Sequence, residues 1–361
     1  MSHTLPSLTA IAVALTISTA LSDEPKPVSY PDHSRLMVVR DAAGSEKPVT
    51  TKADWAERAA HIRANMQLAM GPLPDKARRV PLNVETVSED KTAKYLRRKV
   101  KFTPEPDDRV PAWILIPLDI PQDSQRPAML CLHQTTGIGK DEPAGLGGLK
   151  SLYYAHELAE RGFVCIVPDY PSFGEYPYDF KKQGAHYASG SMKAIWNNIR
   201  AVDLLETLPQ VDPARIGVIG HSLGGHNALF TAVFDERLQA VVTSCGFTPF
   251  HDYYKGKLAG WTSDRYMPRI RDIYHNDPDQ VPFDFYEILG ALAPRGVLSN
   301  SPVDDNNFDL NGVKKAYQKA GDVYSLWNAT SQLKLLTPDA PHDFPEAERQ
   351  MAYEWLSEQF K

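Results

Sequence analysis

The sequence predicts an α/β protein with a doubly wound, mostly parallel β-sheet that helices cover on both faces. From residue 127 onward, short apolar runs without polar alternation recur between segments of helical spacing. Strands that are buried on both faces have such runs, and the helix after each strand lets the next strand run parallel to it. A chain of 361 residues, 42% of them hydrophobic, can bury the core that such a sheet requires.

The N-terminal part of the chain is predicted to contain a leader and an extension. Residues 1–22 contain no Asp, Glu, Lys or Arg, residues 8–21 are largely apolar, and small residues precede Asp23. This pattern predicts a signal peptide, so we expect a periplasmic or secreted protein, and a cytoplasmic one only if the segment has another role. Residues 23–94 form the extension, in which a pattern of helical spacing stops at Gly71 and Pro72.

Residues 95–361 are predicted to form the main domain. A period of two begins near residue 83, and "YLRRKVKF" and "VPAWILIP", joined by the turn-prone "TPEPDD", predict an antiparallel hairpin. The later strands are expected at "PAMLCLH", "FVCIVPDY", "IGVIGHS", "QAVVTSCGF", "RGVLSNSP" and "QLKLLTP". Helices are expected at residues 150–161 and 190–208, after residue 222, at 310–320, and at the C-terminus.

Residues 248–290 interrupt this alternation and are predicted to form a cap. The segment is rich in aromatic residues but has few long apolar runs. An insertion of this length and aromatic content between two strands favours a cap that forms one wall of a binding site. Trp261 and Tyr266 are the candidates for stacking on a sugar ring. Packing of the cap on the main domain explains the same aromatic residues equally well.

Composition and motifs argue against several classes of partner and cofactor. A net charge of −6, with no basic run interleaved with aromatic residues, argues against nucleic acid. The leader is too short for a comfortable membrane span, so none is expected in the mature chain. Three cysteines without a C-x-x-C pair predict buried free thiols. No cofactor motif or metal-binding motif is found. The segment "NFDLNG" resembles the start of a calcium loop, but Asn307 occupies the first ligand position and Gln318 the twelfth, where a bidentate Glu is required. Oligomeric state is left open.

The segment "IGVIGHSLGG" contains the strongest catalytic signal. Residues 220–224 form G-x-S-x-G between a buried strand and a helical segment, which is the context that gives this motif its meaning. The glycines leave room for a tight strand-to-helix turn, and that turn presents Ser222 at the carboxyl end of the sheet. A helix N-terminus there directs backbone N–H groups toward developing negative charge. The pattern therefore predicts that Ser222 is a nucleophile.

A serine nucleophile needs a base, and the base needs a third group to orient it. In doubly wound hydrolases the acid and then the histidine follow the serine. His342 lies in the last strand-to-helix loop, in "PDAPHDFP", and is the predicted base. The acid is expected just after the strand "GVLSN", where Asp305 is favoured, Asp304 is the fallback and Asp309 is a distant third.

The oxyanion hole is predicted to combine two backbone N–H groups. Leu223, directly after the nucleophile, supplies the first. The second comes from the loop after "AMLCLH", where Gln134 is preferred and Thr135 is the alternative. His133 opens this loop and is interpreted as a hydrogen-bonded structural histidine.

These segments together resemble the α/β-hydrolase superfamily. "LCLHQTTG", "VPDYPSFGE", "IGVIGHSLGGHNAL" and "PHDFP" occur in the order that the superfamily uses. The hairpin and the "PDYPSFGE" turn look like the acetyl xylan esterase and dienelactone hydrolase branch, which includes exported bacterial serine esterases. The resemblance covers roughly residues 95–361. It implies a Ser222–His342–Asp305 triad that cleaves acetyl or other short-acyl esters, including those of carbohydrates, through an acyl-enzyme and without a cofactor.

Two departures shape the expected substrate. The related glucuronoyl esterases carry an arginine after the nucleophile, whereas this chain has Leu223, so a glucuronate ester ranks behind an acetyl ester. Dienelactone hydrolases use a cysteine nucleophile, and here the residue is Ser222. A serine peptidase of the oligopeptidase type is an alternative, but too few residues precede the core for its propeller. A non-catalytic binding protein on the same scaffold would be expected to have lost part of the triad.

Overall fold

The computed structural model describes residues 27–121, 124–182 and 186–361. The predicted signal peptide, residues 1–22, lies outside these ranges. Within them, no helix combines the length and the apolar character that crossing a membrane would require.

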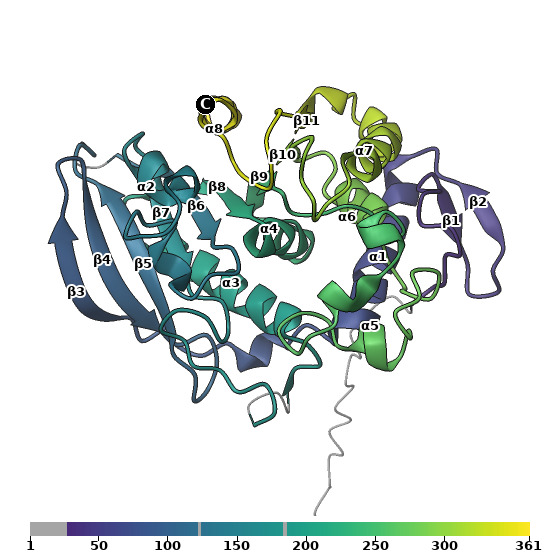
Figure 1. Ribbon diagram of the computed structural model, residues 1–361, viewed down its shortest axis with the longest axis horizontal. Helices are drawn as coiled ribbons and strands as arrows, with labels where there is room; N and C mark the ends of the chain where they lie inside the picture. Colours follow the sequence, from purple (N-terminus) through teal and green to yellow (C-terminus); the bar gives the residue numbers. More distant parts are fainter. Residues whose placement is uncertain (1–26, 122–123, 183–185) are drawn as a thin grey trace, which may run out of the picture.

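A mixed, mostly parallel sheet organises the described part of the chain (Figure 1). Its strand order is β11-β10-β9-β8-β6-β7-β5-β4-β3. The strands are β3 (Glu85–Lys91), β4 (Tyr95–Phe102), β5 (Val110–Pro117), β6 (Arg126–Leu132), β7 (Val164–Pro168), β8 (Val211–His221), β9 (Leu238–Ser244), β10 (Gly296–Asn300) and β11 (Leu333–Leu336). Strands β6 to β11 all run parallel to one another. The pairs β3–β4, β4–β5 and β5–β7 are antiparallel. The predicted fold class and the predicted hairpin, which is β4–β5, are both confirmed.

Helices cover both faces of this sheet, as the apolar strands predicted. The helices are α1 (Lys52–Met70), α2 (Tyr154–Ala159), α3 (Gly190–Thr207), α4 (Leu223–Phe234), α5 (Arg269–Asp272), α6 (Phe285–Ala291), α7 (Leu310–Ser325) and α8 (Glu346–Gln359). Adjacent residues of β8 pack on opposite sides: Val218 joins the core beneath α3 and α4, and Ile219 joins the core beneath α2 and α8. A strand without polar alternation is therefore the sequence that a sheet between two helical layers requires.

The N-terminal extension belongs to the same folded unit as the main domain. Its helix α1 starts at a capping box between Thr51 and Asp54 and ends where Gly71 adopts a φ of 88°. A two-stranded sheet, β1 (Val38–Arg40) and β2 (Glu46–Pro48), lies beside α1, at the opposite end of the molecule from β3 (Figure 1). Strand β3 starts at Glu85, so the main sheet begins ten residues before position 95, the predicted domain boundary.

The extension is also tied to the aromatic insertion. Arg58 of α1 and Glu287 of α6 form an ion pair in which neither side chain is exposed. His33 lies on the other side of Glu287, with 2.8 Å between its Nδ1 and the carboxylate. A buried charge needs such partners, because leaving either one unpaired in the interior is costly. The extension thus helps to fix α6 in place.

The insertion at residues 248–290 packs its aromatic side chains into the core beside α4. Phe250, Trp261, Phe283 and Phe285 are all nearly or fully buried. Phe285 stacks on Phe230 of α4, with ring centroids 5.7 Å apart and the planes 21° from parallel. Aromatic pairs in such arrangements stabilise packing beyond their buried area alone. The aromatic content therefore attaches the insertion firmly to the main domain.

Candidate active site

Ser222 occupies a strained turn between β8 and α4. Its φ of 54° and ψ of −115° lie outside the regions that a residue with a side chain normally adopts. Such backbone strain costs of order 1–3 kcal/mol and is concentrated at functional sites. The turn is held by a hydrogen bond from the Ser222 N–H to the Ser244 carbonyl oxygen of β9, 2.8 Å away.

The glycines around Ser222 are required by close backbone contacts. A Cβ on Gly220 would lie 2.2 Å from the carbonyl oxygen of Gly224, and a Cβ on Gly224 would lie 1.9 Å from the carbonyl oxygen of Leu132. Both obstacles are backbone atoms, so no side chain can move aside to make room. The crowding predicted for the G-x-S-x-G turn is present.

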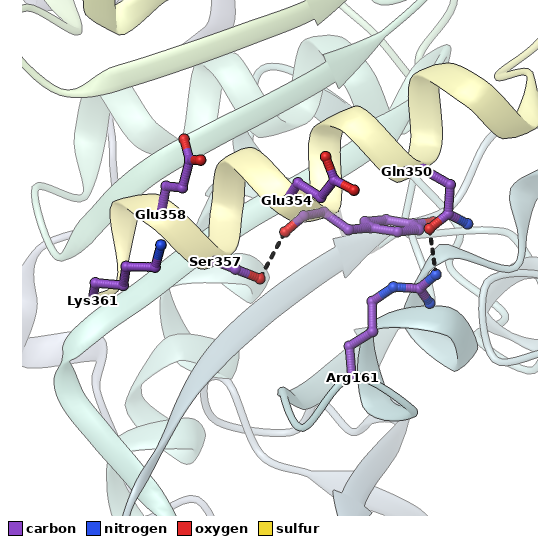
Figure 2. Close-up of a pocket in the computed structure, with 7 residues that line it drawn as sticks. Arg161, Gln350, Glu354, Ser357, Glu358 and Lys361 are labelled. Atoms are coloured by element: carbon purple, nitrogen blue, oxygen red, sulfur yellow. Dashed lines mark hydrogen bonds between the residues drawn. The ribbon is translucent and has the colours of Figure 1, made fainter.

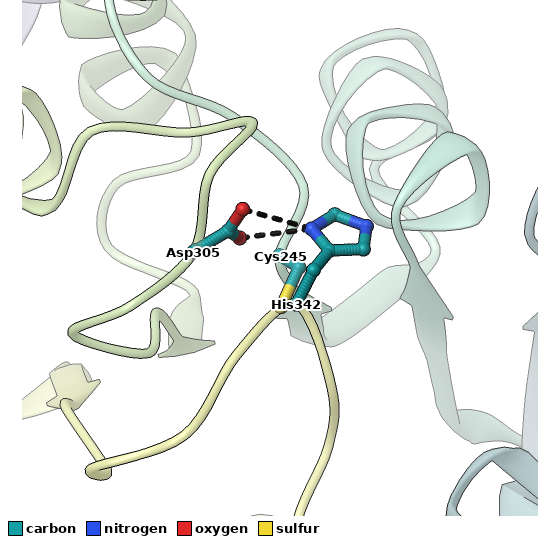
Figure 3. Close-up of side chains that lie close together, drawn as sticks. All are labelled: Cys245, Asp305 and His342. Carbon is teal, nitrogen blue, oxygen red and sulfur yellow. Dashed lines mark hydrogen bonds and ion pairs between the residues drawn. The ribbon is translucent and has the colours of Figure 1, made fainter.

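His342 and Asp305 form a hydrogen-bonded pair (Figure 3), and His342 lines the same cleft as Ser222. The Nδ1 of His342 lies 2.9 Å and 3.0 Å from the two carboxylate oxygens of Asp305. Burial alone would raise the pKa of Asp305, but the hydrogen bond and charge of His342, together with two backbone N–H groups, lower that pKa below its usual value. An ionised Asp305 keeps the proton of His342 on Nδ1, which leaves Nε2 free to accept a proton.

The two other candidate acids lie elsewhere. The Asp304 side chain is exposed, and its backbone N–H donates to the Ala340 carbonyl oxygen at 3.1 Å. Asp309 is the N-cap of α7, where its carboxylate accepts from the backbone N–H of Asn311 at 2.7 Å. The structure thus brings Asp305, the favoured candidate, to His342 and leaves the others as loop and capping residues.

A second histidine, His221, packs against the ring of His342 and was not singled out by the sequence. The two ring centroids lie 4.9 Å apart with an interplanar angle of 65°. The Nδ1 of His221 lies 2.9 Å from Ser244 Oγ, which also accepts from the Asn300 amide at 2.9 Å. Burial, assisted by the neighbouring His342, lowers the pKa of His221 to about 3. His221 is therefore a neutral packing partner.

The backbone that was predicted to form the oxyanion hole is held together by close contacts. Leu223 is the first residue of α4, so its N–H has no acceptor within the helix. The short approach of Gly224 to Leu132 places this helix start against the end of β6, just before Gln134. His133 is buried, accepts from the Tyr170 N–H through Nε2 at 2.9 Å, and donates from Nδ1 to the Gln134 carbonyl at 2.6 Å. These bonds agree with a structural role for His133.

One cleft of about 280 Å³ connects most of the predicted site residues. Its lining comprises Gln134, Thr135, Ser222, Leu223, His226, Tyr253, Gly260, Trp261, Tyr266, Asn307, Phe308 and His342. The insertion forms one wall, as predicted. Thr135 Oγ1 lies 3.1 Å from the Tyr266 hydroxyl and so links the loop after β6 to that wall. Trp261 is 3% exposed, which makes it part of the cap core as well as of the cleft.

His226 is a polar residue of this cleft that sequence reasoning missed. It lies four residues after Ser222 on α4, hence on the same helix face, and this spacing was the signal available. The residue is 4% exposed, and its ring lies 4.8 Å from that of Trp261. Burial lowers the pKa of His226 to about 3, and the nearby Gly246 backbone raises this pKa slightly. Neither ring nitrogen has a partner with hydrogen-bond geometry within the described residues. The Trp261 Nε1 also lacks such a partner.

A larger depression of about 360 Å³ lies on the surface of α8 (Figure 2). It is lined by Arg161, Gln350, Tyr353, Glu354, Ser357, Glu358 and Lys361. Its only hydroxyl nucleophile of the serine type, Ser357, donates to the Tyr353 carbonyl at 2.8 Å. No imidazole lines this depression to act as a base, so the cleft at Ser222 is the candidate active site.

Comparison with known proteins agrees with this architecture. Residues 178–329 match the family model described as glucuronyl esterase of fungi. YtaP, a candidate hydrolase of Bacillus subtilis (strain 168), is 25% identical over 293 residues, which cover 78% of this chain and 93% of YtaP.

Two solved structures illustrate the similarity in fold. A glucuronoyl esterase from Solibacter usitatus superposes with a TM-score of 0.70 at 18% identity, covering 90% of this chain and 97% of its own. A candidate acetyl xylan esterase from Bacteroides fragilis NCTC 9343 superposes with a TM-score of 0.60 at 19% identity, covering 86% and 78%. With its mostly parallel sheet between two helical layers and its serine at the strand-to-helix turn, the chain has the α/β-hydrolase fold.

Proposed function

We propose that the protein is a serine hydrolase of carboxylic esters, with Ser222, His342 and Asp305 as its triad. The observation that carries the proposal is geometric. Ser222, on a strained turn at a helix N-terminus, shares one cleft with His342, whose Nδ1 is hydrogen-bonded to a buried carboxylate. Nucleophile, base and orienting acid are the three parts that acyl transfer by serine requires.

The reaction follows from these positions. Ser222 Oγ attacks the ester carbonyl carbon while His342 Nε2 takes its proton, and Asp305 stabilises the resulting imidazolium. The N–H groups of Leu223 and Gln134 bind the oxyanion of the tetrahedral intermediate. His342 returns the proton to the leaving alcohol, and water then cleaves the acyl-enzyme with the same base.

The oxyanion hole of this chain relies on backbone groups. The side chain of Leu223 packs with Tyr170, Phe173 and Ala194 and is 2% exposed, so it brings no charge to the cleft. This agrees with the departure noted in the sequence, where glucuronoyl esterases carry an arginine. It does not remove the uronate ester as a substrate, because backbone N–H groups alone can stabilise an oxyanion.

The polar atoms of the cleft support a carbohydrate ester, and the uronate ester as the first substrate to test. A neutral His226 offers one donor and one acceptor, and the Trp261 indole offers a donor. A sugar hydroxyl both donates and accepts, so it matches these groups, whereas the methyl of an acetyl group does not. The matching family model and the Solibacter usitatus neighbour are both glucuronoyl esterases. Acetylated sugars are the second candidate, supported by the Bacteroides fragilis neighbour.

The test is a comparison of methyl glucuronate, acetylated xylose and an aryl acetate as substrates. Ser222→Ala should lower turnover of every hydrolysed ester by on the order of 10⁶-fold while the protein stays folded. Retained turnover in that variant would refute the triad. Hydrolysis of a peptide anilide in place of all esters would favour the peptidase alternative, and ligand binding without any turnover would favour a binding protein.

Export is part of this proposal, because residues 1–22 have the pattern of a signal peptide. Mass spectrometry of the protein from its native host tests it. A mature chain that begins at Asp23 is expected, and an intact N-terminus in the cytoplasm would contradict export.

A further inference from the structure

Cys245 lies against the triad in a place that the proposed reaction does not use. Cys245 directly follows β9, with a φ of 48°, and is 1% exposed. Its Sγ, a carboxylate oxygen of Asp305 and a ring nitrogen of His342 all lie within 4.8 Å of one another (Figure 3). The three side chains come from loops at the ends of three neighbouring strands, β9, β10 and β11, so the sheet itself brings them together.

The surroundings of this cluster are negatively charged. Asp305 is 1% exposed at its side chain, and Asp343, next to His342, has a buried Oδ1 with no hydrogen-bond partner within the described ranges. Among those residues, no Lys or Arg forms an ion pair with either carboxylate. Burial raises the pKa of the Cys245 thiol well above its ordinary value, and these two carboxylates raise it further. The thiol is therefore protonated. Among the described residues, only His342 in its protonated form could neutralise the charge of the two carboxylates.

Sulfur, imidazole nitrogen and carboxylate oxygen are together the ligands that zinc and cadmium prefer. A tetrahedral zinc ion with bonds of about 2.0–2.3 Å places its ligands roughly 3.5 Å apart. The Nδ1 of His342 and the nearer Asp305 oxygen lie 2.9 Å apart, closer than this spacing, whereas the widest separation in the cluster is at most 4.8 Å, about 1.3 Å too wide. Side-chain rotation covers both differences. We propose that Cys245, Asp305 and His342 form an inhibitory site for a thiophilic divalent cation.

Binding at this site would block the proposed catalysis, so its effect on activity rests on the proposed function. The ion replaces the thiol proton of Cys245 and the Nδ1 proton of His342. The thiol proton is released to solvent, while neutral imidazole bound through Nδ1 carries its one proton on Nε2. That nitrogen then cannot accept the proton of Ser222. Asp305, as a ligand of the ion, no longer orients the ring. His342 is 20% exposed at its side chain and lines the cleft, which gives the ion a route of entry.

Cadmium binding can be measured without turnover. The full chain carrying Ser222→Ala is titrated with Cd²⁺, and the ultraviolet charge-transfer band of a cadmium–thiolate bond is recorded. We expect a band at one equivalent. Adding Cys245→Ser should abolish it, whereas adding Cys165→Ala, which removes a buried thiol of β7, should leave it intact. No band in the Ser222→Ala protein, or a band that survives Cys245→Ser, overturns the site.

Inhibition supplies the second measurement. The Cd²⁺ concentration that halves ester hydrolysis is determined for the wild type, Cys245→Ser and Cys165→Ala, each relative to its own uninhibited rate. Loss of the thiolate should raise this concentration at least about tenfold, because even groups that only orient metal ligands change affinity by about 10- to 100-fold. Equal inhibition of wild type and Cys245→Ser would overturn the proposal. If the protein hydrolyses no ester, the proposed function fails, while the charge-transfer titration still decides the metal site.

Discussion

The hydrogen bond between Asp305 and His342 gives the sharpest test of the triad. Asp305→Asn replaces one carboxylate oxygen by an NH₂ group. Because Asp305 Oδ1 accepts from the backbone N–H groups of Asn307 and Phe308, the amide oxygen keeps that position and the NH₂ group replaces Oδ2, 3.0 Å from His342 Nδ1. The amide then favours the tautomer with its proton on Nε2, which cannot accept the proton of Ser222.

The expected loss is large. A base held in the wrong tautomer lowers turnover by on the order of 10⁴-fold, which corresponds to about 5.4 kcal/mol of transition-state stabilisation. The matched control is Asp304→Asn, one residue away on the exposed side of the same loop. A surface change of this kind alters free energies by about 0.5 kcal/mol or less, so turnover should change about twofold.

The assay is steady-state hydrolysis of an aryl ester by the wild type and both variants, with circular dichroism as a check on folding. Equal and mild losses in the two variants would show that neither residue orients His342. A large loss in Asp304→Asn alone would move the acid to the neighbouring position and contradict the geometry seen here.

Three further predictions concern the residues around the nucleophile. His226→Leu should raise KM for methyl glucuronate about tenfold, because one hydrogen bond to the sugar is lost, and should leave KM for an aryl acetate unchanged. Equal losses of activity on both substrates would mean that His226 has a structural role. Gly224→Ala should lower the free energy of unfolding by about 3 kcal/mol or more in urea titrations, because its Cβ would lie 1.9 Å from the Leu132 carbonyl oxygen, and an unchanged midpoint would contradict this. His221 and His226 stay neutral in the folded protein, with pKa values of about 3, whereas the unfolded chain binds protons below about pH 6.5. Stability should therefore fall on acidification, by about 4 kcal/mol in total from about pH 8 to about pH 5, and this contribution should disappear in the double variant with asparagine at both positions.

Local sequence determined the elements of this fold. The buried parts of β8 and β9, residues 216–220 and 240–242, are uninterrupted runs without a polar side chain, and the end of α1 is marked by Gly71 and Pro72. The type and approximate position of these elements therefore follow from burial and backbone preference alone. The turn at Ser222 was also recognisable, because the crowding that requires its glycines arises within a five-residue motif. The order of acid and histidine along the chain then restricted the partners to two loops.

Only the tertiary structure decided which side chains meet. It showed that Asp305 contacts His342 while Asp304 points to solvent, a difference between adjacent residues that depends on how the loop after β10 turns. It also revealed His221, His226 and Cys245 around the site. Their burial beside the site depends on strands and helices that are distant in sequence, and the only local signal was the four-residue spacing between Ser222 and His226. The sequence by itself thus predicted the nucleophile and the order of its partners along the chain. The packing of three strand ends decided which side chains surround these residues, and burial among those side chains sets their protonation.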